Sequence, residues 1–182
     1  MTSSMNPSPL SRPAAFLDRD GVINLDIGYP HRIEDLVLTK SAAEGIALLN
    51  RSDYRVIVIT NQSGVARGLF GMDAVHRFHA HMQARLAERG ARIDAFYVAP
   101  YHPDGVIPHL AIEHEDRKPG PGMLLRAIRD YAVDIPHSFL IGDKQSDMEA
   151  ARRAGVRGIL VPTDCCDLAA VVRGQIGSDG VA

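Results

Sequence analysis

The sequence predicts an α/β fold in which a doubly wound parallel sheet is sandwiched by helices. Short apolar runs recur along the chain, bounded by Gly, Pro, Asp or Asn, and such runs are typical of strands buried on both faces of a parallel sheet. Segments of helical period lie between them, and strands that alternate with helices indicate this fold class. The 182 residues, 46% of them hydrophobic, suit a single domain spanning 1–182.

The individual elements follow from local patterns. The strands are expected at 14–17, 56–59, 95–98, 139–141 and 158–161. The helices are expected at about 41–50, 73–89, 121–131 and 146–154. Pro121 suits the first turn of the third helix, and Gly155 suits the left-handed cap of the fourth. We expect 1–13 and 174–182 to be flexible tails and the long irregular stretch 100–120 to be a functional loop.

Charge and composition exclude several classes of protein. The formal net charge of -2 and the pI near 6.4 give no positive footprint for nucleic acid or an anionic membrane. Cys165 and Cys166 form neither a disulfide framework nor a metal-ligand spacing, which fits a reducing compartment. Without a signal peptide or an apolar span, the chain is expected to be cytoplasmic and soluble, and we expect a monomer.

Four polar clusters are predicted to meet at one rim of the sheet. Three of them follow predicted strands directly, at 18–21, 60–64 and 142–144, and 117–119 precedes a predicted helix. In an open α/β sheet, ligands bind beyond the carboxyl ends of the strands. Each cluster alone is also compatible with an ordinary turn or helix cap, but four at one rim predict an active site.

The carboxylates of this rim suit phosphoryl transfer. Asp18, Asp20 and Asp143 make an oxygen-rich site that fits Mg²⁺. Asp18 could attack a phosphoryl group once charge is neutralised, and Asp20 could protonate the leaving oxygen and then deprotonate a water. Lys118 is one of three lysines against seventeen arginines in the chain, which favours a role for its compact charge at the phosphate. Thr60 can donate a hydrogen bond to a phosphate oxygen.

The motifs together resemble those of the haloacid dehalogenase superfamily of phosphatases. The matching segments are 16–24 (FLDRDGVIN), 28–29 (GY), 60–68 (TNQSGVARG), 117–123 (RKPGPGM) and 142–147 (GDKQSD). Within that superfamily they are similar to the heptose-bisphosphate phosphatase and histidinol-phosphatase subfamily, over about residues 14 to 165. All of these motifs in order are far more specific than any single one.

The resemblance implies a role for each matching position. Asp18 is the nucleophile, Asp20 is the general acid/base, and Thr60 and Lys118 steady the phosphoryl group. Mg²⁺ is held by Asp18, by the backbone carbonyl of Asp20 and by Asp143. The positions that match substrate contacts are Asp26, Ile27, Gly28, Tyr29, Asn61, Gln62, Ser63 and Arg117.

Two further features of the sequence bear on what the resemblance implies. The intervals from Asp18 to Thr60 and from Thr60 to Lys118 are filled by predicted core elements, so the chain is expected to lack a cap domain. Relatives in the subfamily often hold a structural zinc through Cys-x-His and Cys-x-Cys, whereas 99–101 is Ala-Pro-Tyr and 114–116 is His-Glu-Asp. A structural zinc site needs four ligands, so we predict that no zinc is bound.

The resemblance implies a small phosphorylated metabolite as substrate. The first hypothesis is that the enzyme removes the 7-phosphate of D-glycero-D-manno-heptose 1,7-bisphosphate. The pathway implied is then carbohydrate metabolism, such as lipopolysaccharide synthesis. Histidinol phosphate remains the alternative substrate. A DNA 3′-phosphatase is disfavoured by the lack of a basic face. A phosphosugar-binding protein without turnover is disfavoured by the intact Asp18, Asp20, Lys118 and Asp143.

Overall fold

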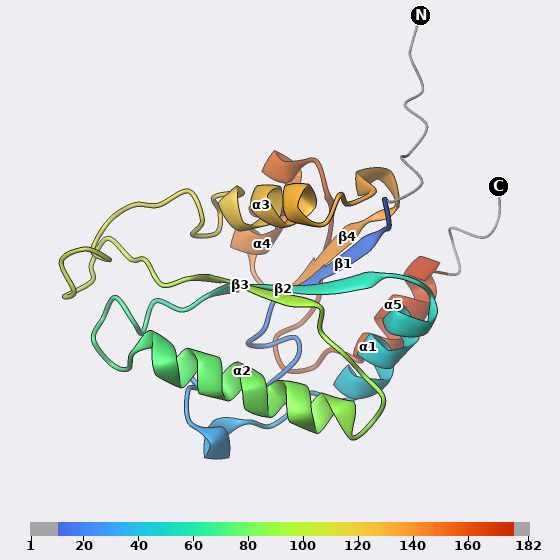
Figure 1. Cartoon of the computed structure of the whole chain (residues 1–182), viewed down its shortest axis with the longest axis horizontal. Helices are drawn as coiled ribbons and strands as arrows, with labels where there is room; N and C mark the ends of the chain where they lie inside the picture. The colour runs from blue at the N-terminus through green and yellow to red at the C-terminus, as the bar shows by residue number, and fades with distance from the viewer. Residues whose placement is uncertain (1–10, 177–182) are drawn as a thin grey trace, which may run out of the picture.

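The structure, a computed structural model, describes residues 11–176. Five strands form one parallel sheet in the order β3-β2-β1-β4-β5. The strands are β1 (Ala14–Leu17), β2 (Arg55–Asn61), β3 (Ala95–Ala99), β4 (Phe139–Gly142) and β5 (Arg157–Leu160). All five expected strands are present, and the predicted fold class is confirmed (Figure 1).

Helices cover both faces of the sheet. They are α1 (Ala42–Arg51), α2 (Met72–Ala87), α3 (Gly122–Asp130), α4 (Gln145–Ala154) and α5 (Leu168–Ile176), with short 3₁₀ turns η1 (Ile33–Asp35) and η2 (Ile135–His137). In Figure 1, α3 and α4 lie above the sheet, and α1, α2 and α5 lie below it. The chain is therefore a three-layer sandwich.

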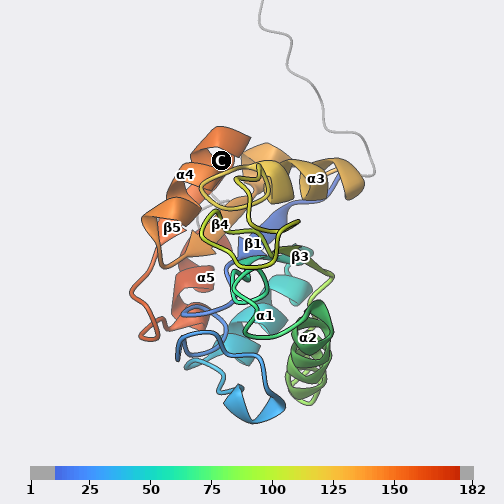
Figure 2. The ribbon, with the colours of Figure 1, turned by 90° about the vertical axis from the view of Figure 1, so that its left-hand side faces the viewer.

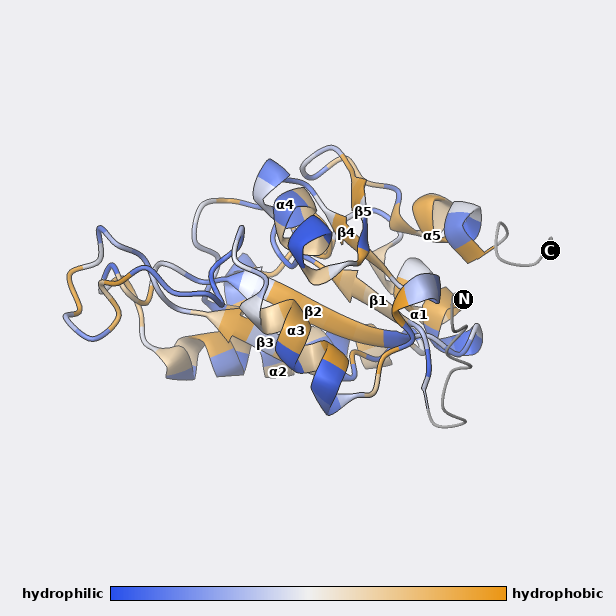
Figure 3. Ribbon diagram, turned by 90° about the horizontal axis from the view of Figure 1, so that it is seen from above, coloured by the Kyte–Doolittle hydropathy of each residue, from blue (hydrophilic) through white to orange (hydrophobic). Residues whose placement is uncertain are grey.

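The core is divided in two by the sheet, because neighbouring side chains of a strand point to opposite faces. In β1, Ala15 and Leu17 belong to the cluster shared with α1, α2 and α5, whereas Ala14 and Phe16 pack with α3 and α4. All four residues are fully buried. Figure 3 shows the hydrophobic residues of the sheet beneath the largely hydrophilic surface of α4.

The strand order positions the site. β1 lies at the centre, with β2 and β3 on one side and β4 and β5 on the other. The chain therefore leaves β1 and β4, which are neighbours, toward opposite sides of the sheet. Such a topological switch point opens a crevice beyond the carboxyl ends of the two strands. Asp18 and Asp143 are the residues that directly follow β1 and β4.

Several details differ from the sequence-based expectations. The edge strands are not buried on both faces: β3 is half-buried and β5 is mostly exposed, since each has a neighbour on one side only. The helix α5 was not expected, and its last residues, 174–176, lie in the segment expected to be a tail. The remaining tail residues, 1–10 and 177–182, lie outside the described residues.

Residues 11–13 were also expected to belong to a flexible tail, but part of this segment is fixed to the fold. The amide of Arg55 donates to the carbonyl of Pro13 at 2.9 Å, and the amide of Asp134 donates to the carbonyl of Arg12 at 3.0 Å.

Between residues 11 and 176, no helix has both the length and the apolar character required to cross a bilayer.

The outer loop, as we name residues 100–120, extends beyond the carboxyl ends of the strands. It lies beside the segment that follows β2, and the amides of Val106 and Ile107 donate to the carbonyl of Ala66 at 2.7 and 3.0 Å. Figures 1 and 2 show the two segments together at the same end of the molecule. No additional domain is inserted between the described strands, as expected for a chain without a cap.

Candidate active site

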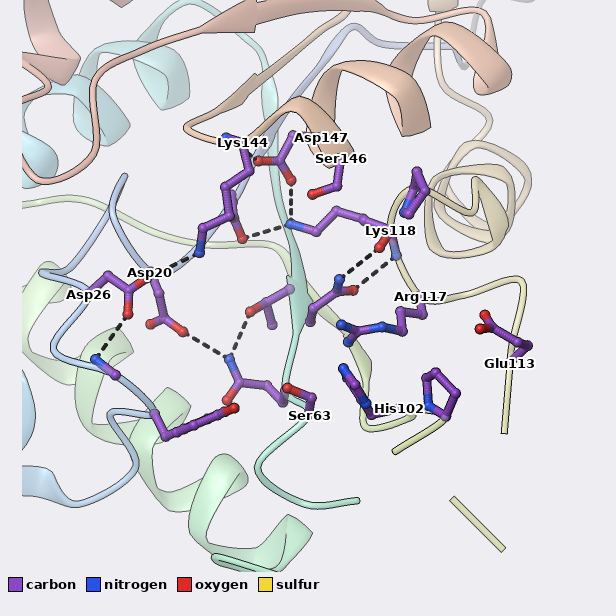
Figure 4. Close-up of a pocket in the computed structure, with 18 residues that line it drawn as sticks. Asp20, Asp26, Ser63, His102, Glu113, Arg117, Lys118, Lys144, Ser146 and Asp147 are labelled. Atoms are coloured by element: carbon purple, nitrogen blue, oxygen red, sulfur yellow. Dashed lines mark hydrogen bonds and ion pairs between the residues drawn. The ribbon is translucent and has the colours of Figure 1, made fainter. Parts of the chain in front are cut away.

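A pocket of about 770 Å³ opens where the strands end. A pocket of this size fits a small metabolite. Its walls come from the segments after β1, β2 and β4 and from the outer loop (Figure 4). The predicted site residues that line it are Asp18, Asp20, Asp26, Gly28, Tyr29, Thr60, Asn61, Gln62, Ser63, Arg117 and Lys118.

Lys118 lies at the bottom of this pocket in a network of buried charges. Its Nζ lies 2.8 Å from Asp18 Oδ1 and 2.6 Å from Asp147 Oδ1, and it donates to the carbonyl of Ile59 at 2.9 Å. Burial by itself would lower the pKa of Lys118, but the two carboxylates raise it. The ammonium group is therefore held in its charged form.

Asp18 is buried beside this ammonium group. Burial raises the pKa of its carboxyl above the usual range, and Lys118 opposes that rise. One oxygen of Asp18 accepts hydrogen bonds from Lys118 and from the amide of Arg19. The side chain is thus fixed against the pocket instead of rotating in solvent.

A pair of hydrogen bonds sets the position of Lys118 itself. The side-chain amide of Asn61, at the end of β2, donates to the carbonyl of Lys118 and accepts from its amide, each at 3.0 Å. The strand end and the outer loop are 57 residues apart in sequence and are joined here. Asn61 therefore has a structural role in this site, in addition to lining the pocket.

Asp18, Asp143 and Asp147 form the acidic centre. One carboxylate oxygen from each residue lies within 4.8 Å of the corresponding oxygens of the other two. No second group of this kind occurs between residues 11 and 176. Thr163 Oγ1 donates to Asp143 Oδ2 at 2.7 Å, while the buried Oδ1 of Asp143 has no hydrogen-bond partner. A buried carboxylate oxygen in an all-oxygen cluster fits a hard divalent cation.

Two glycines make room for the acidic centre. Gly21 has a φ of 86°, and a Cβ there would lie 2.4 Å from Asp143 Oδ2. At Gly142 a Cβ would lie 2.4 Å from the Cβ of Asp147. Because both contacts are shorter than carbon atoms tolerate, these positions admit glycine alone without displacing the carboxylates.

Asp20 is held by four donors. Arg19 binds it through Nε at 2.8 Å and Nη2 at 2.9 Å, and Asn24 and Gln62 donate their amides at 2.9 and 3.1 Å. Gln62 also donates to Thr60 Oγ1 at 2.9 Å. Asp20, Gln62 and Thr60, which all line the pocket, are thus joined side chain to side chain by hydrogen bonds.

The structure and the sequence-based site differ at three points. Asp143 belongs to the acidic centre but is not among the residues that line the pocket. Ile27 is 57% exposed and does not line the pocket, because its side chain leaves the turn on the solvent side. Asp147, which the sequence analysis left out of the metal site, joins Asp18 and Asp143 as a potential ligand. Its place four residues after Asp143, in the first turn of the helix that follows β4, was the signal available in the sequence.

Further lining residues were given no role in the sequence-based site, although some belong to the clusters predicted at this rim. Lys144 lines the pocket and lies 3.1 Å from Asp26 Oδ2. Although burial raises the pKa of Asp26, the hydrogen bonds from Lys144 and from Gly28 lower it more. The scarcity of lysine in the chain pointed to Lys144 as well as to Lys118. The other lining residues without a role in the sequence-based site are His102, Pro103, Glu113, Pro119, Ser146 and Asp147.

The outer loop is held by ring stacking and by backbone hydrogen bonds. The rings of Tyr101 and His114 stack with centroids 3.8 Å apart, and Arg67 Nη2 lies 3.1 Å from His102 Nε2. Arg117 Nη1 donates to the carbonyl of Tyr101 at 3.2 Å. The two ends of the loop are therefore fastened together next to the guanidinium group that lines the pocket.

Comparison with known proteins agrees with this geometry. The family model described as HAD-hydrolase-like matches residues 116–182. A D-glycero-beta-D-manno-heptose-1,7-bisphosphate 7-phosphatase from Rhodopseudomonas palustris is 47% identical over 85% of this chain and 86% of its own. A D-glycero-alpha-D-manno-heptose-1,7-bisphosphate 7-phosphatase from Photorhabdus laumondii is 41% identical over 82% of each chain.

A solved structure is similar over nearly the whole chain. The D,D-heptose 1,7-bisphosphate phosphatase from B. bronchiseptica, complexed with magnesium and phosphate, has a TM-score of 0.82 and 32% identity, covering 91% of this chain and 99% of its own. Fold, site and sequence together define a phosphoric monoester hydrolase. The chain belongs to the haloacid dehalogenase-like phosphatases, as its motifs predicted.

Proposed function

We propose that this chain is a Mg²⁺-dependent phosphatase that removes the 7-phosphate of D-glycero-D-manno-heptose 1,7-bisphosphate through an aspartyl-phosphate intermediate. The observation that carries the chemistry is the buried contact of Lys118 with both Asp18 and Asp147 at the bottom of the pocket. The activities for which the similar proteins are named support the substrate.

In the first half of the reaction, a carboxylate oxygen of Asp18 attacks the phosphorus atom. The bond from phosphorus to the sugar oxygen breaks, and Asp20 transfers a proton to that oxygen. In the second half, Asp20 takes a proton from a water whose oxygen attacks the phosphorus. The bond to Asp18 breaks, inorganic phosphate leaves, and both aspartates return to their initial states.

Lys118 and Thr60 serve the phosphoryl group in this reaction. The ammonium group of Lys118 already contacts Asp18 Oδ1 and can contact a phosphoryl oxygen as charge develops. The hydroxyl of Thr60 accepts from Gln62, so its own proton is free to be donated into the pocket. Lys118 and Thr60 thereby position the phosphorus atom in front of Asp18.

Asp18, Asp143 and Asp147 would hold the Mg²⁺ ion, together with the backbone carbonyl of Asp20. Bound there, it would neutralise phosphoryl oxygens and so reduce their repulsion of the attacking carboxylate. Asp147 is shared with Lys118, so its carboxylate would balance both cations. The absence of zinc from the outer loop stays a prediction, which metal analysis of the purified protein tests.

Two cationic side chains support a substrate with a second phosphate. Lys144 and Arg117 line the pocket from different segments, on the sides toward Asp26 and toward the outer loop. A guanidinium fork suits a phosphate, and Asp26, Gly28, Tyr29 and Ser63 offer polar groups to sugar hydroxyls. Histidinol phosphate, the alternative, has an amino group in place of the second phosphate and would leave Arg117 without an anionic partner.

The substrate test is a comparison of kcat/KM on both anomers of the heptose bisphosphate and on histidinol phosphate, with Mg²⁺ present. We expect one of the two anomers to exceed histidinol phosphate by at least about 100-fold, because two phosphates contact the pocket. A preference for histidinol phosphate would overturn the substrate and leave the chemistry intact.

The nucleophile is tested separately with Asp18→Asn. We expect kcat to fall by about 10⁴-fold or more, since removing a covalent nucleophile leaves only binding and electrostatic effects. After a rapid acid quench, radioactive phosphate from the substrate should label the wild-type protein and not the variant. Turnover of the variant at the wild-type rate would exclude Asp18 as the nucleophile.

A cytoplasmic location and a monomeric state stay predictions from the sequence.

A further inference from the structure

Arg19 lies between the two proposed catalytic aspartates, but its side chain turns away from the pocket into the interior. It is the largest side chain in the described part of the chain that is fully buried. Its guanidinium carbon lies 4.6 Å from the centre of the Phe78 ring. Burial of a guanidinium group costs free energy unless its donors are paired. The partners of Arg19 therefore indicate its role.

Those partners lead from the active site to helix α2. Toward the pocket, Nε and Nη2 of Arg19 form a two-pronged contact with Asp20 at 2.8 and 2.9 Å. Nη2 also donates to the carbonyl of Pro30 at 2.9 Å. On the opposite side, Nη1 lies 3.1 Å from Nε2 of His79, a buried residue of α2. The guanidinium group is therefore held from both sides.

His79 is built to accept this hydrogen bond. Its ring stacks on Phe96 of β3 with centroids 4.2 Å apart, which fixes the direction in which Nε2 points. Burial, reinforced by the charge of Arg19, lowers the pKa of His79 to about 3. The ring is uncharged at neutral pH, so Nε2 can accept from the guanidinium group instead of repelling it.

The two-pronged contact determines how far Asp20 can rotate. Besides Arg19, the carboxylate is contacted by Asn24 and Gln62, which each donate one hydrogen bond from a neutral amide. A planar guanidinium group bound through two nitrogens sets the plane of a carboxylate, whereas single hydrogen bonds do not. Proton transfer requires the oxygen within hydrogen-bond reach of the leaving group, so a small rotation costs rate.

We infer that Arg19 and His79 are positioning residues for the proposed reaction: Arg19 sets the direction of the Asp20 carboxylate, and His79 holds Arg19 in place from behind. The inference rests on the proposed function, in which Asp20 donates a proton to the leaving oxygen. It makes a buried residue of α2, outside the motifs quoted from the sequence, part of the support for acid catalysis.

The test uses two phosphates that differ in their need for an acid. Benzyl phosphate releases an alkoxide-like oxygen that needs a proton, and p-nitrophenyl phosphate releases a stable phenolate that does not. kcat/KM reports the first phosphoryl transfer, so the ratio of the two values measures how well Asp20 donates. The variants are His79→Leu, which removes the acceptor, and His79→Gln, which retains one. His76→Leu, at an exposed histidine of the same helix, is the matched control.

For His79→Leu we expect kcat/KM to fall by about 30-fold on benzyl phosphate and by less than about 3-fold on p-nitrophenyl phosphate. His79→Gln should recover most of the loss, and His76→Leu should match the wild type. Arg19→Lys, which cannot form the two-pronged contact, should give the same selective loss and serves if His79→Leu does not fold.

Equal losses on both phosphates would overturn the inference, because a structural defect lowers both. So would a His79→Leu protein with unchanged ratios. These outcomes are distinct from failure of the proposed function: a wild-type protein that hydrolyses neither these two phosphates nor the heptose bisphosphate in the presence of Mg²⁺ would overturn that function, and this inference with it.

Discussion

The two sides of the pocket are held together by different forces. At the acidic centre, Asp18, Asp147 and Lys118 are almost completely buried, and the charged atoms lie 2.6–2.8 Å apart. The outer loop is held by the stacked rings of Tyr101 and His114 and by backbone hydrogen bonds, and Val106 on it is 70% exposed. The acidic centre is fixed by charge pairs that are shielded from solvent. The outer loop is fixed by contacts that solvent can replace.

This difference separates chemistry from recognition. Buried charge pairs resist displacement, because breaking one leaves an uncompensated charge in a medium of low dielectric constant. Exposed stacking and single backbone bonds are weaker and can change with less cost to the fold. We therefore expect substitutions at the centre to lower kcat and stability, and substitutions in the outer loop to raise KM.

Among the substitutions that test this contrast between the two sides of the pocket, Lys118→Met is expected to have the largest effect. Without the ammonium group, the carboxylates of Asp18 and Asp147 are left buried and unpaired, so the metal-free protein should lose about 3 to 5 kcal/mol of unfolding free energy. kcat should fall by about 10³-fold, as expected for the loss of one charged group at the developing oxyanion. Urea denaturation and steady-state kinetics measure the two changes.

Lys40→Met is the matched control for this prediction, since Lys40 is an exposed lysine with a single ion pair to Asp167. Its unfolding free energy should lie within about 0.5 kcal/mol of the wild-type value, and its kcat should match that of the wild type. If Lys118→Met kept its activity, the centre would not depend on buried charge, and the contrast between the two sides of the pocket would fail.

A smaller effect is expected for Arg117→Gln, on the side of the outer loop. The change removes the guanidinium group that faces the pocket and donates to Tyr101. KM for the heptose bisphosphate should rise by about 100-fold, whereas kcat/KM for p-nitrophenyl phosphate, which has no second phosphate, should change little. Arg51→Gln, on the exposed surface of α1, provides the control. A loss of kcat on both substrates would place Arg117 in the chemistry instead.

Mild acid should destabilise the interior behind the centre. The pKa of His79 falls from 6.5 to about 3 on folding, mainly through burial and then through the charge of Arg19, with a smaller effect of His76. The unfolded chain therefore binds the proton more tightly, and stability is lost as pH falls below 6.5 toward 3. From pH 7 to pH 5 this group should remove about 2 kcal/mol of unfolding free energy.

The measurement is urea denaturation at both pH values for the wild type, His79→Gln and His76→Gln. The change in unfolding free energy between pH 7 and pH 5 should be smaller by about 2 kcal/mol in His79→Gln than in the wild type. His76→Gln should show the same change as the wild type. An unchanged dependence in His79→Gln would mean that the histidine is protonated in the folded protein and cannot accept from Arg19.

The smallest effect is expected for Tyr101→Leu. Loss of the stacked ring frees the ends of the outer loop, so amide hydrogen exchange over 102–114 should become faster and KM should rise about 5-fold at unchanged kcat. Tyr101→Phe keeps the ring and should behave as the wild type. Unchanged exchange in the leucine variant would show that the backbone bonds to Ala66 suffice to hold the loop.

The elements predicted from the sequence were those with strong local signals. β1, β2 and β4 were found because both faces are buried and their residues are uniformly apolar. α5 was missed because its apolar run, with Leu168 and Val172 in the core, is short. A capping signal was present, since Asp167 Oδ1 accepts from the amide of Ala170 at 3.1 Å. Of the site, the residues that follow strand ends were found, and Ile27 was placed in the pocket by position alone although its side chain is exposed.

By itself, the sequence determined which segments are strands, that their ends carry Asp18, Thr60 and Asp143, and to which superfamily those motifs belong. The tertiary structure decided which charges share one environment. Lys118 meets Asp18 and Asp147, and His79 meets Arg19, across 29 to 100 residues of chain. The physical reason is that local patterns are set by backbone geometry and apolar spacing, whereas pairing of buried charges depends on how distant segments pack around a sheet.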